Sequence, residues 1–233
     1  MPRVALRRPL RSSSAGYTTE AVLDVFRKNG LDAERSARMA RGGNRYAELV
    51  PEFPFSYRRI IEGDRVKIGD HEWRAFIGHG HAPEHLSLYC EALNVVIAGD
   101  MLLSTISTNV SVWSIDPEGD PLRLFLESIA RYRELPENVL VLPSHGKPFR
   151  GAHARVAQLE AHHQDRLQEL GKALQQKPRS AGDLLGVLFR RPLDAHQTFF
   201  AMGEAIAHLH FLYYAGSAKR APGADGIMRY AAS

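Results

Sequence analysis

The sequence predicts an α/β fold followed by a winged-helix-like helical part. Between about residues 64 and 146, short apolar runs of strand length alternate with polar turns and one amphipathic helical stretch. From about Gly151 onward, long segments with helical periodicity take over and end in a hairpin-like tail. The chain has 233 residues and is 44% hydrophobic, which is enough for a packed core. We therefore expect two domains, residues 1–150 and residues 151–233.

The elements of the first domain follow from local patterns. The segment 18–30 reads as a helix that starts at a Thr cap and ends at Asn-Gly, and a loop with Pro51 and Pro54 follows. Side chains alternate on both sides of Gly69-Asp70, which predicts a hairpin. Residues 120–135 place their apolar side chains on one helical face, with Pro121 at the start. The further expected strands are residues 86–90, 94–100 and 138–146.

The second domain reads as three helices and a hairpin. A long amphipathic helix is stopped by Pro178, and Ser180 is the expected cap of the next. A Pro-Gly-Ala-Asp-Gly turn near the C-terminus separates two short strand-like runs. Three helices followed by a hairpin are typical of a winged-helix module. The expected helices are residues 152–178, 180–191 and 194–216, and the hairpin covers residues 217–232.

Composition excludes several classes of protein. No apolar run approaches the roughly 18 to 20 residues that a membrane-spanning helix needs, so we expect a cytoplasmic protein without a membrane partner. The Arg- and Ser-rich residues 1–14 are expected to be a disordered leader. Cys90 is the only cysteine, which excludes an intramolecular disulfide framework. Residues 51–150 carry ten Lys and Arg against fourteen Asp and Glu, a surplus that suits either a cation site or an ordinary solvated surface.

Three candidate metal ligands stand beside apolar strands. His85 follows the first hairpin, Asp100 follows "VVIAG", and His145 follows "VLVLPS". Functional groups of open sheets gather beyond the ends of strands, so these side chains can converge although they are far apart in sequence. Imidazole nitrogens and a carboxylate oxygen are suitable ligands for zinc, and also for iron or manganese.

The stretches "GHGHAPEH" (78–85), "IAGDMLL" (97–103) and "LPSHGKPF" (142–149) resemble the third, fourth and fifth metal motifs of the metallo-β-lactamase superfamily. The resemblance continues into the C-terminal part, which looks like the winged-helix tail of one bacterial branch. It implies a metal-dependent hydrolase of esters, thioesters, lactams or phosphodiesters, with two zinc ions in the complete site. The expected fold is accordingly a partial metallo-β-lactamase αββα sandwich followed by a winged-helix-like domain.

The same resemblance implies roles for individual residues. His85, Asp100 and His145 match the metal ligands, and Asp100, which bridges two metals in the family, is also the expected catalytic residue. The remaining residues of the motifs would shape the loops or hydrogen-bond to the ligands. This supporting set comprises His79, His81, Gly99 and Gly146.

One departure from the family leaves alternatives open. Family members carry a His-x-His-x-Asp-His loop before these motifs, whereas this chain has no histidine before His71. That loop supplies ligands to both metals, so the sequence resembles the family domain starting late. The chain is then either a hydrolase of small-molecule esters, thioesters or RNA, or a catalytically incomplete scaffold, or a nucleic-acid-binding winged-helix protein. A sheet without its first strands also predicts a homodimer through the exposed sheet edge.

Two further groups of residues have competing interpretations. Lys219, Arg220 and Arg229 on the C-terminal hairpin could contact nucleic acid, although an ordinary solvated hairpin is the simpler interpretation. His162 and His163 are expected on a solvated face of their helix. Glu204 and His208, four residues apart, are expected to form a surface or packing pair.

Overall fold

The computed structural model describes residues 18–42 and 56–233, so the expected leader and the loop with Pro51 and Pro54 lie outside the described residues. The elements of the first part are α1 (Thr19–Lys28), α2 (Ala33–Gly42), β1 (Arg65–Ile68), β2 (His71–Gly78), β3 (His85–Cys90), β4 (Val95–Gly99), α4 (Pro121–Ala130), the 3-10 helix η1 (Arg131–Glu134) and β5 (Leu140–Pro143). Those of the second part are α5 (Ala152–Gln176), α6 (Ala181–Leu188), α7 (Ala195–Tyr214), β6 (Ala218–Pro222) and β7 (Met228–Ala232).

Local signals in the sequence set most of these boundaries. Helix α1 begins where the Thr18 side chain accepts a hydrogen bond from the Ala21 N–H at 3.1 Å, and the chain leaves it through Gly30 at φ 89°. Strands β1 and β2 pair antiparallel around Gly69, which has φ 59°. The predicted hairpin at Gly69-Asp70 is therefore confirmed.

Within the part of the chain that the structure describes, five strands form one sheet in the order β1-β2-β3-β4-β5. The first three pairings are antiparallel and β4 pairs parallel with β5, which requires a crossover connection. Helix α4 lies within that crossover, where the amphipathic pattern predicted it, and the Asp120 side chain caps it. The expected order of four strands, a helix and a strand is confirmed.

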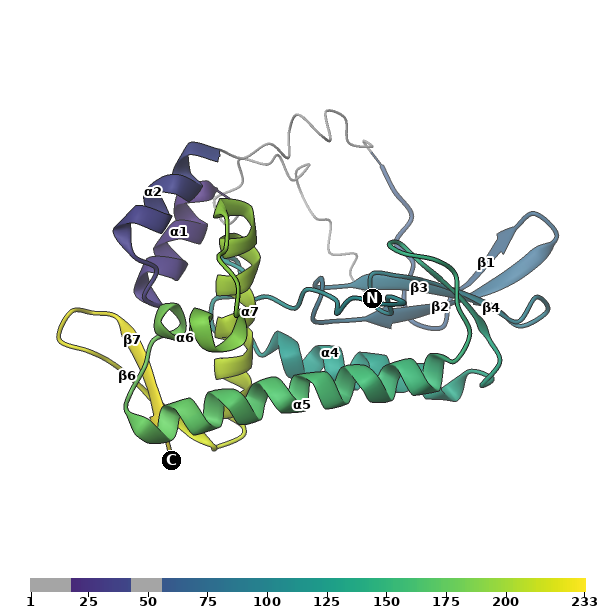
Figure 1. Cartoon of the computed structure of the whole chain (residues 1–233). Coiled ribbons are helices and arrows are strands. Elements are labelled where there is room, and N and C mark those ends of the chain that lie inside the picture. The colour runs from purple at the N-terminus through teal and green to yellow at the C-terminus, as the bar shows by residue number, and fades with distance from the viewer. Residues whose placement is uncertain (1–17, 43–55) are drawn as a thin grey trace, which may run out of the picture.

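The described residues form two hydrophobic cores. One joins the sheet to α4, η1 and the first half of α5. The other joins the second half of α5, α6, α7 and the C-terminal hairpin to α1 and α2. The 25-residue helix α5, about 37 Å long at 1.5 Å per residue, lies beneath both (Figure 1). The division at residue 150 stays a prediction, but the N-terminal helices pack with the C-terminal ones.

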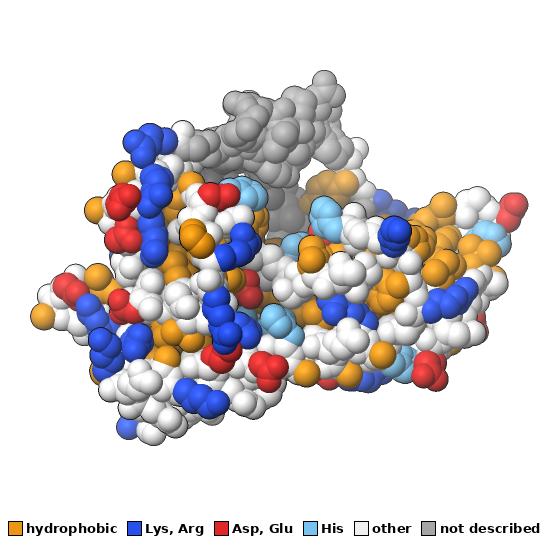
Figure 2. Space-filling model, in the orientation of Figure 1, with side chains coloured by type: hydrophobic (Ala, Val, Ile, Leu, Met, Phe, Trp, Pro, Cys, Tyr) orange, Lys and Arg blue, Asp and Glu red, His pale blue; other side chains and the backbone are white. Residues whose placement is uncertain are grey.

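The two faces of the sheet differ in what covers them. Phe76, Tyr89 and Val96 point from one face into the core with α4 and α5. Alternate residues point to the other face, where Ala75 and Cys90 are buried but seven apolar side chains, which we call the apolar face, remain partly exposed; Leu86 is 38% exposed and Ile97 is 37% exposed. Figure 2 shows hydrophobic side chains gathered over the strand layer at the right of the view. The apolar face comprises Ile77, Leu86, Leu88, Val95, Ile97, Leu140 and Leu142.

The predicted helices and hairpin of the C-terminal part are present. Ser180 caps α6 in a capping box with Asp183, as its sequence position predicted. Strands β6 and β7 form the expected antiparallel hairpin. The assignment to the winged-helix class stays a prediction. Within the described segments, no helix combines the length and apolarity needed to cross a membrane.

One histidine expected in solvent is buried. His163 is 1% exposed, because its side of α5 packs against α7, so the prediction of a solvated face is wrong for this residue. Its Nδ1 lies 3.1 Å from Nε2 of His208, whose Nδ1 lies 2.8 Å from the Glu204 carbonyl oxygen. A carbonyl only accepts, so His208 donates from Nδ1, and His163 must donate from Nδ1 to the bare Nε2 of His208. The expected packing role of Glu204 and His208 fits this contact.

Candidate functional site

Three neighbouring strands bring the predicted ligands together. His85 is the first residue of β3, Asp100 directly follows β4, and His145 lies two residues after β5. β3 runs antiparallel to β4, and β4 runs parallel to β5. The first residue of β3 and the last residues of β4 and β5 therefore lie at the same end of the strands. The expected convergence therefore rests on mixed strand directions rather than on a purely parallel sheet.

The Asp100 carboxylate lies between two imidazoles. Nε2 of His81 is 3.5 Å from Oδ2, and Nε2 of His145 is 3.6 Å from Oδ1. Both distances exceed a normal hydrogen bond, and Oδ1 is buried without a hydrogen-bond partner. Asp100 is thus the centre of the group, with one imidazole facing each carboxylate oxygen.

His85 contacts the backbone of Asp100 rather than its carboxylate. The Asp100 N–H donates to Nε2 of His85 at 3.1 Å, so the imidazole carries its proton on Nδ1, which is buried without a partner. Burial, followed by the neighbouring His81, lowers the pKa of His85 below its ordinary value. The ring is therefore neutral at pH 7, as a metal-binding imidazole must be, but its Nε2 lone pair is engaged.

Two glycines of the predicted set leave room for this arrangement. Gly99 has φ 55°, and a Cβ there would lie 2.6 Å from Nε2 of His85. Gly146 has φ 85°, and a Cβ there would collide with the Ser104 hydroxyl. Both positions combine a backbone conformation that favours glycine with a close approach of another side chain.

The other two predicted supporting residues hold the loop before β3. Nδ1 of His79 donates to the Pro83 carbonyl at 2.6 Å, and its backbone N–H donates to Ser128 at 2.9 Å. Nδ1 of His81 donates to the backbone carbonyl of Asn109 at 2.8 Å, which turns Nε2 of His81 toward Asp100.

Sequence reasoning missed the loop that follows Asp100. The Thr108 hydroxyl donates to the Asp100 carbonyl at 2.6 Å, and Asn109 supplies the acceptor for His81. Residues 104–112 have no helical or strand periodicity, so no pattern in the sequence indicates that they return to the site.

The donor types suit a metal ion, but their present arrangement is incomplete. Two ligand atoms of a tetrahedral zinc ion, with bonds of about 2.0–2.1 Å, lie about 3.3 Å apart. The separations of 3.5 and 3.6 Å between Asp100 and the imidazoles His81 and His145 are close to that value. Nevertheless, in residues 18–42 and 56–233 no three His, Cys, Asp or Glu side chains form a group that could hold an ion. His85 would first have to release the Asp100 N–H.

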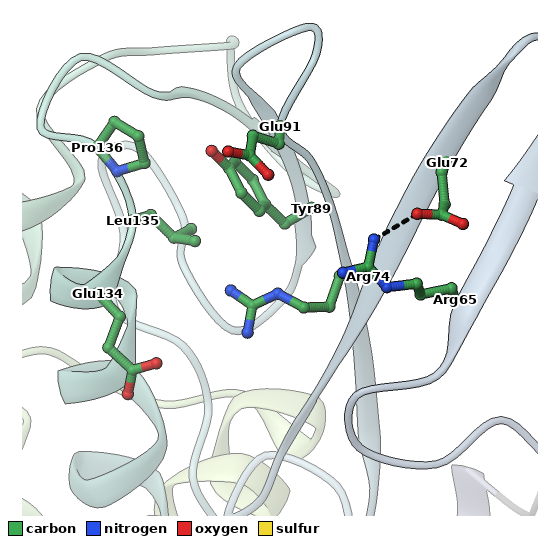
Figure 3. Close-up of a pocket in the computed structure, with 8 residues that line it drawn as sticks. All are labelled: Arg65, Glu72, Arg74, Tyr89, Glu91, Glu134, Leu135 and Pro136. Atoms are coloured by element: carbon green, nitrogen blue, oxygen red, sulfur yellow. Dashed lines mark hydrogen bonds and ion pairs between the residues drawn. The ribbon is translucent and has the colours of Figure 1, made fainter.

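A cavity between β2, β3 and η1 lies away from this group. It has a volume of about 510 Å³ and opens at the other end of β2 and β3, beside η1 (Figure 3). Arg74 extends between Tyr89 and Glu134, and its guanidinium lies 4.1 Å from the Phe76 ring centroid. This cavity holds none of the predicted site residues. Its lining consists of Arg65, Glu72, Arg74, Tyr89, Glu91, Glu134, Leu135 and Pro136.

The basic residues of the C-terminal hairpin are mostly engaged within the chain. Arg220 forms an ion pair with Glu118, and its guanidinium lies 4.4 Å from the Tyr213 ring centroid. Arg229 pairs with Asp225 at 2.7 Å. Lys219 is exposed on β6. Two of the three predicted nucleic-acid contacts would therefore have to exchange an existing partner for a phosphate.

Comparison with known proteins agrees with the motifs. The sequence model of the metallo-beta-lactamase superfamily matches residues 19–145, and that of the metallo-beta-lactamase-like C-terminal domain matches residues 167–233. The chain therefore belongs to the metallo-beta-lactamase superfamily, and the predicted family is confirmed.

Two solved structures and one curated protein illustrate the relationship. A beta-lactamase domain protein from Burkholderia ambifaria is 50% identical with a TM-score of 0.87, covering 92% of this chain and 62% of that chain. A metallo-beta-lactamase family protein from Thermus thermophilus is 30% identical with a TM-score of 0.71, covering 92% and 64%. A probable metallo-hydrolase of Bacillus subtilis is 27% identical over 144 residues, covering 60% and 44%. The chain thus spans less than two thirds of each of these relatives.

Proposed function

We propose that this protein is a metal-dependent hydrolase whose site is built around Asp100. The observation that supports it is the carboxylate of Asp100 with an imidazole Nε2 at 3.5 Å from one oxygen and another at 3.6 Å from the second. The probable metallo-hydrolase of Bacillus subtilis agrees with this reaction class. Substrates of the proposed class are esters, thioesters, lactams and phosphodiesters, either small molecules or RNA. As part of the same proposal, the protein is located in the cytoplasm and has no membrane partner.

In this proposal, each predicted site residue either binds the metal or supports a residue that does. His85, Asp100 and His145 would hold the metal, with zinc as the first choice and iron or manganese as alternatives. When bound, such an ion lowers the pKa of its water to about 7 and supplies hydroxide near neutral pH. His79 and Gly99 keep the loop and the His85 ring in place, and Gly146 leaves room for Ser104.

Metal binding to the purified chain tests this proposal. We expect calorimetric titration with zinc chloride to show binding, and Asp100→Asn to weaken it at least about tenfold because the central carboxylate is lost. Asp165→Asn, at an exposed position of α5, is the matched control and should leave zinc affinity unchanged. Equal zinc affinity of the Asp100→Asn variant and the unaltered chain would contradict the role of Asp100. Zinc-dependent turnover of chromogenic ester, thioester, lactam and phosphodiester substrates then identifies the reaction.

A catalytically incomplete scaffold is the second candidate. It is favoured by the lack of a three-ligand group within the described residues. Metal-dependent hydrolysis by the purified chain would exclude it.

The nucleic-acid-binding alternative predicts RNA affinity that falls steeply with salt and that Lys219→Ala weakens. Salt-independent or undetectable RNA binding would count against that alternative.

We also propose a homodimer in which the second copy meets the exposed sheet edge and also packs over the apolar face. Unpaired edge strands and exposed apolar side chains both favour association. In Ile97→Lys, a charge replaces a side chain that is 37% exposed on this face, and the variant should shift the weight-average mass toward the monomer in sedimentation equilibrium. Ile106→Lys, at a loop position that is 57% exposed, is the control. A monomeric unaltered chain at all concentrations would refute the dimer.

A further inference from the structure

Helix α7 makes a close backbone contact with the loop that follows Asp100. The Val112 N–H donates to the Gly203 carbonyl at 3.1 Å. A Cβ on Gly203 would lie 2.6 Å from the Ser111 hydroxyl oxygen and 2.7 Å from its Cβ. Only a residue without a side chain fits between this turn of α7 and the loop, so the position of the loop depends on Gly203.

A short series of hydrogen bonds leads from this contact to the candidate site. The Ser111 hydroxyl donates to the side-chain Oδ1 of Asn109 at 2.8 Å, and the backbone carbonyl of Asn109 accepts from Nδ1 of His81 at 2.8 Å. The last bond fixes the His81 proton on Nδ1 and turns Nε2 toward Oδ2 of Asp100, 3.5 Å away.

The same loop also holds Asp100 itself. Thr108 is 2% exposed, and its hydroxyl donates to the Asp100 carbonyl at 2.6 Å. Residues 108–112 therefore contact both His81 and Asp100 on one side and α7 on the other. A displacement of this loop would change the distance between the imidazole and the carboxylate.

We propose that α7, through the contact of Gly203 with Ser111, is a positioning element that orients His81 against Asp100. The C-terminal helices are then part of the candidate site rather than a separate module. The orientation of His81 can be measured with or without a metal. The expected effect of the His81 orientation on metal affinity rests on the proposed function.

The variant Gly203→Ala tests the contact, and Gly186→Ala is its control. Both changes place alanine inside a helix and gain similar helix propensity, but a Cβ at Gly186 meets nothing within 4 Å. In long-range ¹H–¹⁵N spectra at about pH 8, we expect Gly203→Ala to lose the Nδ1–H tautomer of His81. Zinc affinity should fall about tenfold, which is typical when a residue that faces a metal ligand, here His81 beside Asp100, is displaced. Gly186→Ala should change neither quantity.

A second substitution separates positioning from general destabilisation. Ser111→Gly removes the side chain that the new Cβ would meet, together with the hydroxyl that donates to Asn109, so Gly203→Ala should cause no further loss of the His81 Nδ1–H tautomer in a Ser111→Gly background. If Gly203→Ala does not fold, Ser111→Ala, which removes the hydrogen bond to Asn109 without adding volume, should still increase the minor tautomer.

The possible results separate this inference from the proposed function. An unchanged His81 tautomer in folded Gly203→Ala overturns the inference, and so does an unchanged tautomer in Ser111→Ala if Gly203→Ala is unfolded. A loss of the tautomer in Gly203→Ala that does not occur in the Ser111→Gly background supports the inference, even if neither the variant nor the unaltered chain binds zinc. In that last case the proposed metal function fails while the positioning role stands.

Discussion

Acidification should destabilise this protein through the buried imidazoles of His163 and His208. Burial away from water, followed by the neighbouring imidazoles, lowers the pKa of His163 to about 3, and burial lowers that of His208 to about 4. Both return to about 6.5 in the unfolded chain. Below about pH 6.5 the unfolded chain therefore binds more protons than the folded one, and the free energy of unfolding falls as the pH falls.

The variant His163→Asn isolates one of these two contributions. A pH of about 5 lies about 1.5 units below the pKa that each imidazole has in the unfolded chain. Each imidazole therefore lowers the free energy of unfolding by about 2 kcal/mol relative to pH 8. The asparagine amide can still donate to Nε2 of His208, so the second imidazole keeps its partner. Burial raises the pKa of Glu204 to about 7, which acts in the opposite direction, but this contribution is common to both proteins and cancels.

Urea denaturation followed by circular dichroism at both pH values gives the required difference. The drop in unfolding free energy from pH 8 to 5 should be about 2 kcal/mol smaller in His163→Asn than in the unaltered protein. His196→Asn, at an exposed position of α7, should leave the drop unchanged. Equal drops in His163→Asn and the unaltered protein would refute the argument that His163 is neutral and buried in the folded state.

Two further substitutions test the packing of the site and of the core. Gly99→Ala and Gly69→Ala both force alanine to positive φ, at 55° and 59°, but only the first brings a Cβ against His85. We expect about 1 kcal/mol of destabilisation in the control and at least about 2 kcal/mol in Gly99→Ala by urea denaturation, and equal values would count against the close approach. Tyr132→Phe removes the 2.7 Å hydrogen bond to the buried Ser87 and should cost about 1 kcal/mol in the same assay; no loss would mean that the bond contributes nothing.

The local elements follow from sequence because their causes are local. The cap at Ser180, the turn at Gly69 and the start of α4 at Pro121 each depend on residues within a few positions, and each lies where the pattern predicted it. The family could likewise be predicted, since three short motifs kept their order and spacing.

The candidate site could be predicted only in part. Placement at strand ends brought Asp100 and His145 within 3.6 Å, as expected. The loop residues Thr108 and Asn109 were missed, because nothing in residues 104–112 signals a return to the site. Nor does spacing reveal that the His85 Nε2 lone pair faces a backbone N–H rather than an open position.

By itself, the sequence determined the strands, most of the helices, the family and the residue types available for a metal. The tertiary structure alone decided that α1 and α2 pack with the C-terminal helices and that His163 lies buried against α7. It also brought the turn of α7 at Gly203 against the loop that holds His81 and Asp100. Capping and periodicity act within one or two turns of the chain. Contacts between residues about 90 positions apart depend on how whole elements pack, and no local pattern encodes them.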